Sequence, residues 1–302
     1  MIVGTLRQPH ALDLGPLNGP MLCFGGLYSN AQATKALLAE ADRMEIPAER
    51  MICTGDVVAY GGDPLICVDL IRTAGVPVVM GNYEESLGLA AGDCNCGFEP
   101  GGDCAEWSEA WFANAARALD EDARAWMRAL PRRILFEMAG RRFVVIHGGI
   151  DDISQYVFAS TPAGTKAAII ERLDVDGVIA GHSGLAFTEI LGPGMWHNAG
   201  AIGLPANDET TRGWFSLLTP DRDTGAIQIT LHALDYDHEQ AARAIRAVTP
   251  DLPYAETLST GLWPNMAVLP ERERKQRGRP ITPRTVVWPP PGAGTAPSVA
   301  AE

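Results

Sequence analysis

Four short apolar runs of this chain each end in a polar residue that can bind a metal ion, and this pattern constrains the fold most. The runs are MICTGD, VPVVMGN, FVVIH and VDGVIAGH, and they end in Asp56, Asn82, His147 and His182. Short apolar runs bounded by turn residues are typical of buried strands. Because an α/β sheet places its chemistry where strands end, we expect these four side chains to converge on one point.

One carboxylate, one amide oxygen and two imidazoles together predict a transition-metal site. Hard oxygen and borderline nitrogen ligands suit Zn²⁺, Mn²⁺ or iron better than Ca²⁺ or Mg²⁺. Each residue taken alone is ordinary at a strand end, where Asp, Asn and Gly are common. The occurrence of all four, with glycines beside them that allow close backbone approach, favours a shared site.

The charge of the chain limits its partners. A formal net charge of −13 over 302 residues argues against nucleic acid or an anionic membrane, because both would be repelled. A small phosphorylated substrate fits, provided that a metal or an arginine binds it locally. The amino terminus lacks a cationic start followed by a long apolar core, and no stretch approaches the roughly 20 apolar residues of a membrane span. We expect a cytoplasmic protein, and the sequence predicts no oligomeric state.

The first half of the chain alternates strands with helices. Residues 20–24 read as a strand, after which Ser29 or Asn30 can cap a helix. Pro64 opens a second helix, and residues 76–80 form another strand. This alternation predicts right-handed crossovers and a mainly parallel sheet.

The second half reads as antiparallel strands. The segment ILFEMAGRRFVVIH predicts a hairpin that turns at Ala139 and Gly140, and further strands follow. The expected fold is α/β, with two mixed β-sheets packed as a sandwich and flanked by helices in four layers. The expected divisions are an N-terminal extension at 1–19, a domain at 20–248 with a helical and Cys-containing flank at 88–130, and a C-terminal extension at 249–302 that is largely irregular from 270.

The ordered blocks GGLYSN, GDVVAYGGDP, VVMGNYEE, VVIHGG and GVIAGHSG resemble the calcineurin-like metallophosphoesterases over about residues 20–235. That family carries Asp-x-His, Gly-Asp, Gly-Asn-His, a lone His and Gly-His-x-His in this order. The resemblance implies hydrolysis of a phosphodiester or phosphomonoester with one or two divalent ions (Mn, Fe or Zn). It also implies that Asp56 bridges two ions, while Asn82, His147 and His182 complete the shell of the second.

The ligands of the first ion are missing from the matching positions. The family's Asp and His of the first loop fall on Gly26 and Tyr28, and its last His falls on Gly184. The resemblance therefore implies a degenerate first metal site. The family's catalytic His falls on Tyr83, which we expect to act with Asp56 in catalysis, although a phenol is a poorer acid than imidazole at neutral pH.

Three hypotheses follow from these departures. The first is a hydrolase with a single metal ion at the four residues. The second keeps two ions and recruits replacement ligands, with the candidates Tyr28, Asp63, Glu84, Glu85 and His197. The third is a non-hydrolytic metal-binding or redox-regulatory protein on a degenerate phosphoesterase fold. We expect hydrolysis, on family analogy.

A cysteine cluster and one arginine complete the candidates. Cys94, Cys96 and Cys104 lie in the loop that follows Asn82, and as thiolates they could reach the vacated first metal position. Their C-x-C-x7-C spacing differs from ordinary structural zinc sites, so a surface loop that forms a disulfide is the alternative. Arg212 is a candidate for binding the substrate phosphate, together with Asn82.

Overall fold

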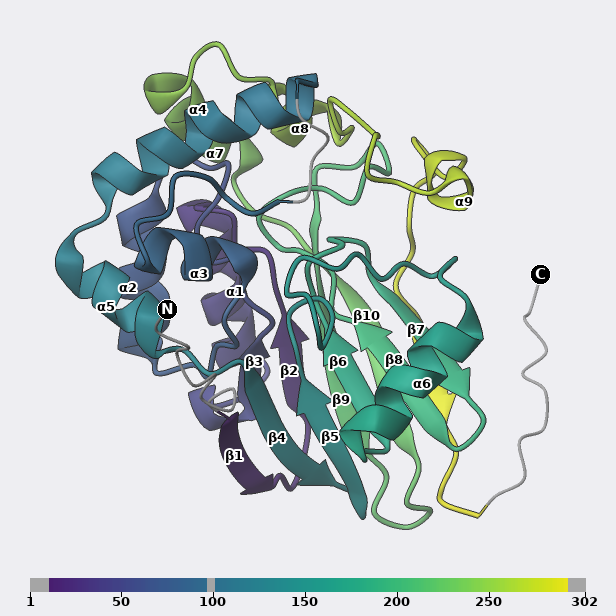
Figure 1. Cartoon of the computed structure of the whole chain (residues 1–302). Coiled ribbons are helices and arrows are strands. Elements are labelled where there is room, and N and C mark those ends of the chain that lie inside the picture. Colours follow the sequence, from purple (N-terminus) through teal and green to yellow (C-terminus); the bar gives the residue numbers. More distant parts are fainter. Residues whose placement is uncertain (1–10, 97–100, 293–302) are drawn as a thin grey trace, which may run out of the picture.

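The computed structural model describes residues 11–96 and 101–292, and within them the chain forms two β-sheets that face each other (Figure 1). The six-stranded sheet has the order β1 (Ala11–Pro16), β4 (Arg133–Met138), β5 (Arg141–Val145), β6 (Gly177–Ala180), β8 (Gly194–Asn198) and β7 (Phe187–Leu191). The five-stranded sheet has the order β11 (Arg284–Trp288), β10 (Ile227–Leu234), β9 (Gly213–Pro220), β2 (Met21–Phe24) and β3 (Met51–Cys53). Both sheets contain parallel and antiparallel pairs, as the sequence predicted.

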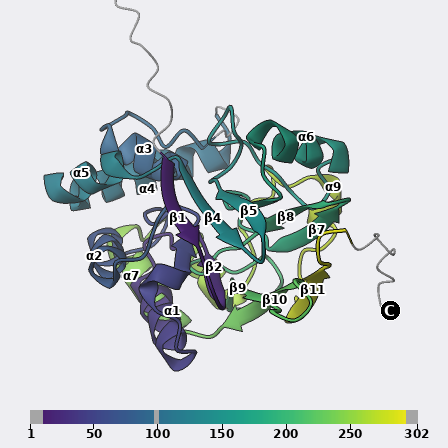
Figure 2. The ribbon, with the colours of Figure 1, turned by 90° about the horizontal axis from the view of Figure 1, so that it is seen from below.

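Helices cover the outer faces of the two sheets (Figure 2). The helices are α1 (Ala31–Arg43), α2 (Pro64–Ala74), α3 (Asn82–Gly88), α4 (Asp103–Ala118), α5 (Glu121–Ala129), α6 (Ala163–Leu173), α7 (His238–Val248), α8 (Tyr254–Thr260) and α9 (Glu271–Arg274). Helix α6 packs on β7 and β8, while α1 packs on β10 of the other sheet. Within the described residues, none of these helices is long and apolar enough to cross a membrane.

Aromatic side chains fill the space between the sheets. Phe136 and Phe143 stack with their ring centroids 4.6 Å apart, and Trp288 meets Phe143 edge-on at 5.6 Å. All three side chains are buried. Large buried rings of this kind dominate core energetics, so this cluster holds the two sheets together.

Two local predictions are confirmed. The side chain of Asn30 accepts a hydrogen bond of 2.9 Å from the backbone N–H of Ala33 and so caps α1. Strands β4 and β5 form the predicted hairpin, with both turn residues at positive φ, 49° for Ala139 and 71° for Gly140. These are the backbone angles that a two-residue hairpin turn requires.

The terminal segments are more ordered than the sequence indicated. Strand β1 lies within the expected N-terminal extension and pairs in parallel with β4. Beyond residue 270, α9 and β11 form, and β11 pairs with β10. The expectation of an irregular segment was too strong here, because Trp288 at the end of β11 inserts between the sheets, where it is 2% exposed.

Candidate metal centre

Strand ends from both sheets bring three of the four predicted residues together, and the start of a helix brings the fourth. The strand predicted at residues 76–80 is wrong, because this segment forms only an isolated bridge between Cys53 and Val78. Asp56 follows β3 of the five-stranded sheet, while His147 and His182 follow the parallel strands β5 and β6 of the six-stranded sheet. Asn82 begins α3. All four are buried, with exposed fractions of 2% for Asp56, 0% for Asn82, 2% for His147 and 9% for His182.

The potential ligand atoms of these residues surround one point. His147 Nε2 lies 3.1 Å from Asn82 Oδ1 and 3.1 Å from His182 Nδ1. It lies 3.3 Å from Asp56 Oδ1. One ligand atom each from Asp56, His147 and His182 lies within 4.8 Å of the others. The spatial convergence expected from the strand ends is thus present.

The hydrogen bonds around this point show that electron-pair donors face one another. His147 Nδ1 lies 2.7 Å from the carbonyl oxygen of Thr54, which accepts its N–H, so a neutral ring presents a lone pair at Nε2. The Asn82 side-chain N–H donates to the carbonyl oxygen of Cys94 at 2.9 Å, which turns Oδ1 toward the cluster. Among the residues that the structure describes, none donates a hydrogen bond to Asp56 Oδ1. A proton on His147 Nε2 would form a hydrogen bond with only one of these acceptor atoms at a time, whereas a metal cation attracts all of them.

Burial and charge shift the pKa values in this cluster. Burial opposes protonation of His147, but the nearby charge of Asp56 outweighs it, so the pKa of His147 is raised. Burial and the charge of His147 hold the pKa of His182 well below its usual value. His182 is therefore neutral, which is the form that binds metals.

Glu84 supports the Asp56 loop from behind. Its carboxylate accepts backbone N–H groups from Asp56 at 2.9 Å, Val57 at 2.8 Å and Gly81 at 3.0 Å. Burial, with the charge of Asp56, raises the pKa of Glu84 to about 7. Because its oxygens are turned to these N–H groups, Glu84 orients the loop, a role that the sequence did not reveal.

The loops that carry Asp56 and His182 adopt uncommon backbone angles. Asp56 has a φ of 58° and His182 a φ of 57°, in the left-handed region that few non-glycine residues occupy. A Cβ atom on Gly81 would lie 2.4 Å from Asp56 Oδ1, so only glycine lets α3 start this close to the carboxylate. Strained backbone of this kind is found at functional sites, where surrounding contacts maintain it.

A tyrosine ring lies where the resemblance placed ligands of a first ion. A Cβ atom on Gly26 would lie 2.6 Å from Cζ of Tyr28, and one on Gly184 would lie 3.6 Å from the Tyr28 hydroxyl. The ring of Tyr28 therefore occupies space beside both glycines. Burial, followed by the charge of Asp56, raises the pKa of Tyr28 well above its usual value, which favours the phenol over a phenolate ligand.

Tyr83, the expected acid, is held in an aromatic cluster. Its hydroxyl lies 2.6 Å from that of Tyr60, and its ring packs edge-on against Trp111 with centroids 4.9 Å apart. Burial raises the pKa of Tyr83 well above its usual value. A higher pKa makes a phenol a weaker acid at neutral pH, so these surroundings disfavour proton donation.

Several other candidates have different partners. His197 Nδ1 lies 2.9 Å from the hydroxyl of Thr188, and burial lowers the pKa of His197 to about 4. Arg212 donates to the carbonyl oxygen of Ile281 at 3.0 Å. Glu85 pairs with Arg132. Asp63 precedes α2 as its N-cap residue.

The cysteine expectation needs correction. Cys94 and Cys96 are joined in a disulfide, so their sulfur atoms are not thiolate ligands, and the disulfide alternative describes this loop. The side chain of Cys104 lies outside the described residues. The loop nevertheless touches the metal cluster, because its backbone carbonyl groups orient Asn82.

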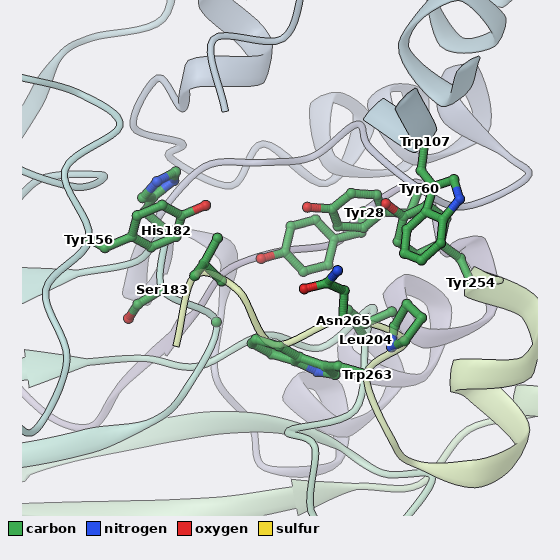
Figure 3. Close-up of a pocket in the computed structure, with 13 residues that line it drawn as sticks. Tyr28, Tyr60, Trp107, Tyr156, His182, Ser183, Leu204, Tyr254, Trp263 and Asn265 are labelled. Carbon is green, nitrogen blue, oxygen red and sulfur yellow. The ribbon is translucent and has the colours of Figure 1, made fainter. Parts of the chain in front are cut away.

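A cavity opens beside His182 (Figure 3). Aromatic side chains line most of it: Tyr28, Tyr60, Trp107, Tyr156, Tyr254 and Trp263. Sequence reasoning missed this cavity, although the aromatic residues of YAETLSTGLW were a visible signal.

Comparison with known proteins agrees with this architecture. Residues 27–221 match the model of the calcineurin-like phosphoesterase superfamily domain. An uncharacterized protein of Methanocaldococcus jannaschii is 34% identical over 61 residues, which cover 20% of this chain and 24% of that relative. The chain thus matches about a quarter of the length of this curated relative.

Solved structures show the same fold at low identity. A metallophosphoesterase from Sphaerobacter thermophilus has a TM-score of 0.61 at 20% identity, with 80% of this chain and 99% of that chain covered. A hypothetical protein from Pyrococcus horikoshii has a TM-score of 0.67 at 16% identity, with 80% and 98% covered. With the family model matching well over half of its residues, this chain belongs to the calcineurin-like phosphoesterase superfamily, whose members use divalent metal ions.

Proposed function

We propose that this protein hydrolyses a small phosphate ester with one divalent metal ion held by Asp56, Asn82, His147 and His182. The observation that carries this proposal is the meeting of four buried electron-pair donors at one point, where no residue of the described ranges 11–96 and 101–292 donates a hydrogen bond to Asp56 Oδ1. A buried carboxylate is costly unless a cation or hydrogen bonds compensate its charge.

A bound divalent ion supplies a Lewis acid for a phosphoryl oxygen and lowers the pKa of a water molecule. The chain's own groups prepare the site. The Thr54 carbonyl fixes the tautomer of His147, and the Cys94 carbonyl fixes the orientation of Asn82. Such outer partners orient ligands and increase their affinity.

A single ion is favoured over two. Gly26 and Gly184 supply no side-chain ligand, and the ring of Tyr28 lies against both positions. Tyr28 also lines the cavity. Tyr83 is not part of the lining, and its hydroxyl is hydrogen-bonded to that of Tyr60. We therefore assign to the Tyr28 phenol, rather than to Tyr83, the role of hydrogen-bond donor to the oxygen of the reacting phosphate.

Metal content and hydrolysis measured on the same samples test the proposal. We expect about one divalent ion per chain and metal-dependent hydrolysis of bis(4-nitrophenyl) phosphate or 4-nitrophenyl phosphate. Asp56→Asn and His182→Ala should lose both metal and activity. His197→Gln is the matched control, because it replaces a buried histidine that contacts Thr188, and it should retain both. A wild-type protein that binds no divalent ion, or an active Asp56→Asn variant, would contradict the proposal.

A second candidate function is metal binding without turnover. The observation that favours it is the absence of side-chain donors at Gly26 and Gly184. The same measurements separate the two functions, because this alternative predicts one bound ion and no hydrolysis of either ester.

A further inference from the structure

The cavity beside His182 is lined by aromatic rings and carries no charged wall. Its lining contains no Lys, Arg, Asp or Glu side chain among the described residues. Such a cavity offers no positive charge to an anionic group, so we expect the phosphate to lie at the metal end. The rest of the cavity suits an uncharged group with a large apolar surface.

The aromatic walls begin at the proposed metal ligand. Gly184 stands two residues after His182, and a Cβ atom there would lie 3.7 Å from the Trp263 indole and 3.6 Å from the Tyr28 hydroxyl. Figure 3 shows Tyr28 and Trp263 on either side of this space, with His182 and Ser183 at one end. The cavity is therefore continuous with the metal cluster, and one substrate molecule can contact both.

The rings are held in place before any ligand binds. The indole N–H of Trp263 donates to the carbonyl oxygen of Pro205 at 2.6 Å, which fixes the plane of the indole. The ring of Tyr60 stacks on that of Tyr254 with centroids 4.4 Å apart, and the ring centroids of Tyr28 and Tyr60 are 5.1 Å apart. Fixed rings lower the entropic cost of binding a flat ligand.

We propose that this cavity is a subsite for a planar, uncharged aromatic ring, either a nucleobase or a simple aryl group, carried by the phosphate ester. The inference rests on the proposed function for the phosphate end only. Tyr254 and Trp263 lie outside residues 27–221 that match the family model, so this chain builds the subsite with its own C-terminal segment.

A quaternary ammonium group is the competing occupant of an aromatic cavity. Binding of such a cation would require ring faces turned toward it, and a nearby carboxylate would strengthen the binding. Here Tyr60 and Tyr254 stack on each other, and no carboxylate lines the cavity among the described residues. The planar ring is therefore the better match.

Ligands without phosphate test the subsite separately from catalysis. Binding of adenosine, phenol and choline to the full-length protein would be measured by isothermal titration calorimetry, in the wild type and in Asp56→Asn. We expect adenosine or phenol to bind both proteins with similar affinity, because the ring does not contact the metal. Adenosine binding identifies a nucleobase subsite, and binding of phenol alone identifies an aryl subsite. Because Asp56→Asn removes the proposed metal site, binding to this variant tests the subsite even if the proposed function is wrong.

Variants of the cavity wall locate the binding site. Trp263→Leu should weaken binding by about tenfold or more, since stacking of one ring is worth about 1–3 kcal/mol. Trp126→Leu, which replaces another half-buried tryptophan outside the cavity, should bind as the wild type does. Val268→Trp leaves Trp263 itself unchanged and adds bulk to the cavity lining, so it should also weaken binding. Retained affinity in both cavity variants, binding of choline alone, or no binding of adenosine and phenol at millimolar concentration would overturn the proposal.

Discussion

The backbone N–H of Asp56 donates a hydrogen bond of 2.9 Å to the carboxylate of Glu84, which lies in the first turn of α3. The same carboxylate accepts N–H groups from Val57 and Gly81. One buried anion thus fixes two loops of the metal cluster. The position of the proposed ligand depends on a residue that binds no metal itself.

Replacing Glu84 by glutamine should disturb both stability and metal binding. The amide NH₂ group would face N–H donors, and buried donors without acceptors cost about 1–3 kcal/mol each. We expect a loss of roughly 2–4 kcal/mol in unfolding free energy and metal affinity lower by about tenfold to hundredfold. Urea unfolding and metal titration measure these effects. Glu85→Gln, on the same helix turn, breaks only the partly exposed pair with Arg132 and should cost less than about 1 kcal/mol. Equal effects in the two variants would refute the assigned role.

Removal of metal should lower the melting temperature of the wild type. A ligand that binds only the native state stabilises it by about 2.7 kcal/mol at a concentration one hundred times its dissociation constant. EDTA should therefore lower the melting temperature by several degrees in a calorimetric scan, and excess Mn²⁺ or Zn²⁺ should restore it. The His147→Ala variant should have the same melting temperature in the presence and in the absence of EDTA. A wild type insensitive to EDTA would argue against a bound ion.

Substitution by phenylalanine should have different effects at Tyr28 and at Tyr83. Tyr28→Phe removes a hydroxyl that lines the cavity and should lower kcat by roughly tenfold to hundredfold. Tyr83→Phe removes the hydrogen bond to Tyr60 and should mainly cost about 1 kcal/mol of stability. Steady-state kinetics and urea unfolding of both variants separate the roles. A slow Tyr83→Phe variant with native stability would return the acid role to Tyr83.

The buried His197 should make the protein less stable in mild acid. Burial lowers its folded-state pKa to about 4, against about 6.5 in the unfolded chain. Between these values the unfolded chain binds the proton and the native state does not, so stability is lost as the pH falls from about 6.5 to about 4. The loss approaches roughly 3 kcal/mol at the lower limit. Urea unfolding at pH 7.5 and 5 should show a smaller difference for His197→Gln than for the wild type. His238→Gln, at the start of α7, is the control.

The sequence was informative where the signal was local. Asp56, Asn82, His147 and His182 could be identified because each ends an apolar run, and the ends of such runs are where α/β folds place binding residues. That they would meet from two different sheets was not visible in the sequence. The hairpin at Ala139 and Gly140 likewise follows from adjacent residues.

Features that depend on distant parts of the chain were not predictable. Strands β1 and β11 are edge strands whose order comes from pairing with β4 and β10. The cavity joins Tyr28 to Trp263 from opposite ends of the chain, and no local pattern links them. The directions of Tyr83 and Glu84 are set by how α3 packs, and a sequence does not specify that direction.

The packing of Tyr28 against Gly26 has a consequence for engineering a second metal ion into this protein. An aspartate introduced at position 26 would collide with the tyrosine ring, because its Cβ atom alone would lie 2.6 Å from Cζ. The Cβ atom of a histidine introduced at position 184 would lie 3.6 Å from the hydroxyl of the same phenol. A designed binuclear centre therefore requires replacement of Tyr28 together with both glycines.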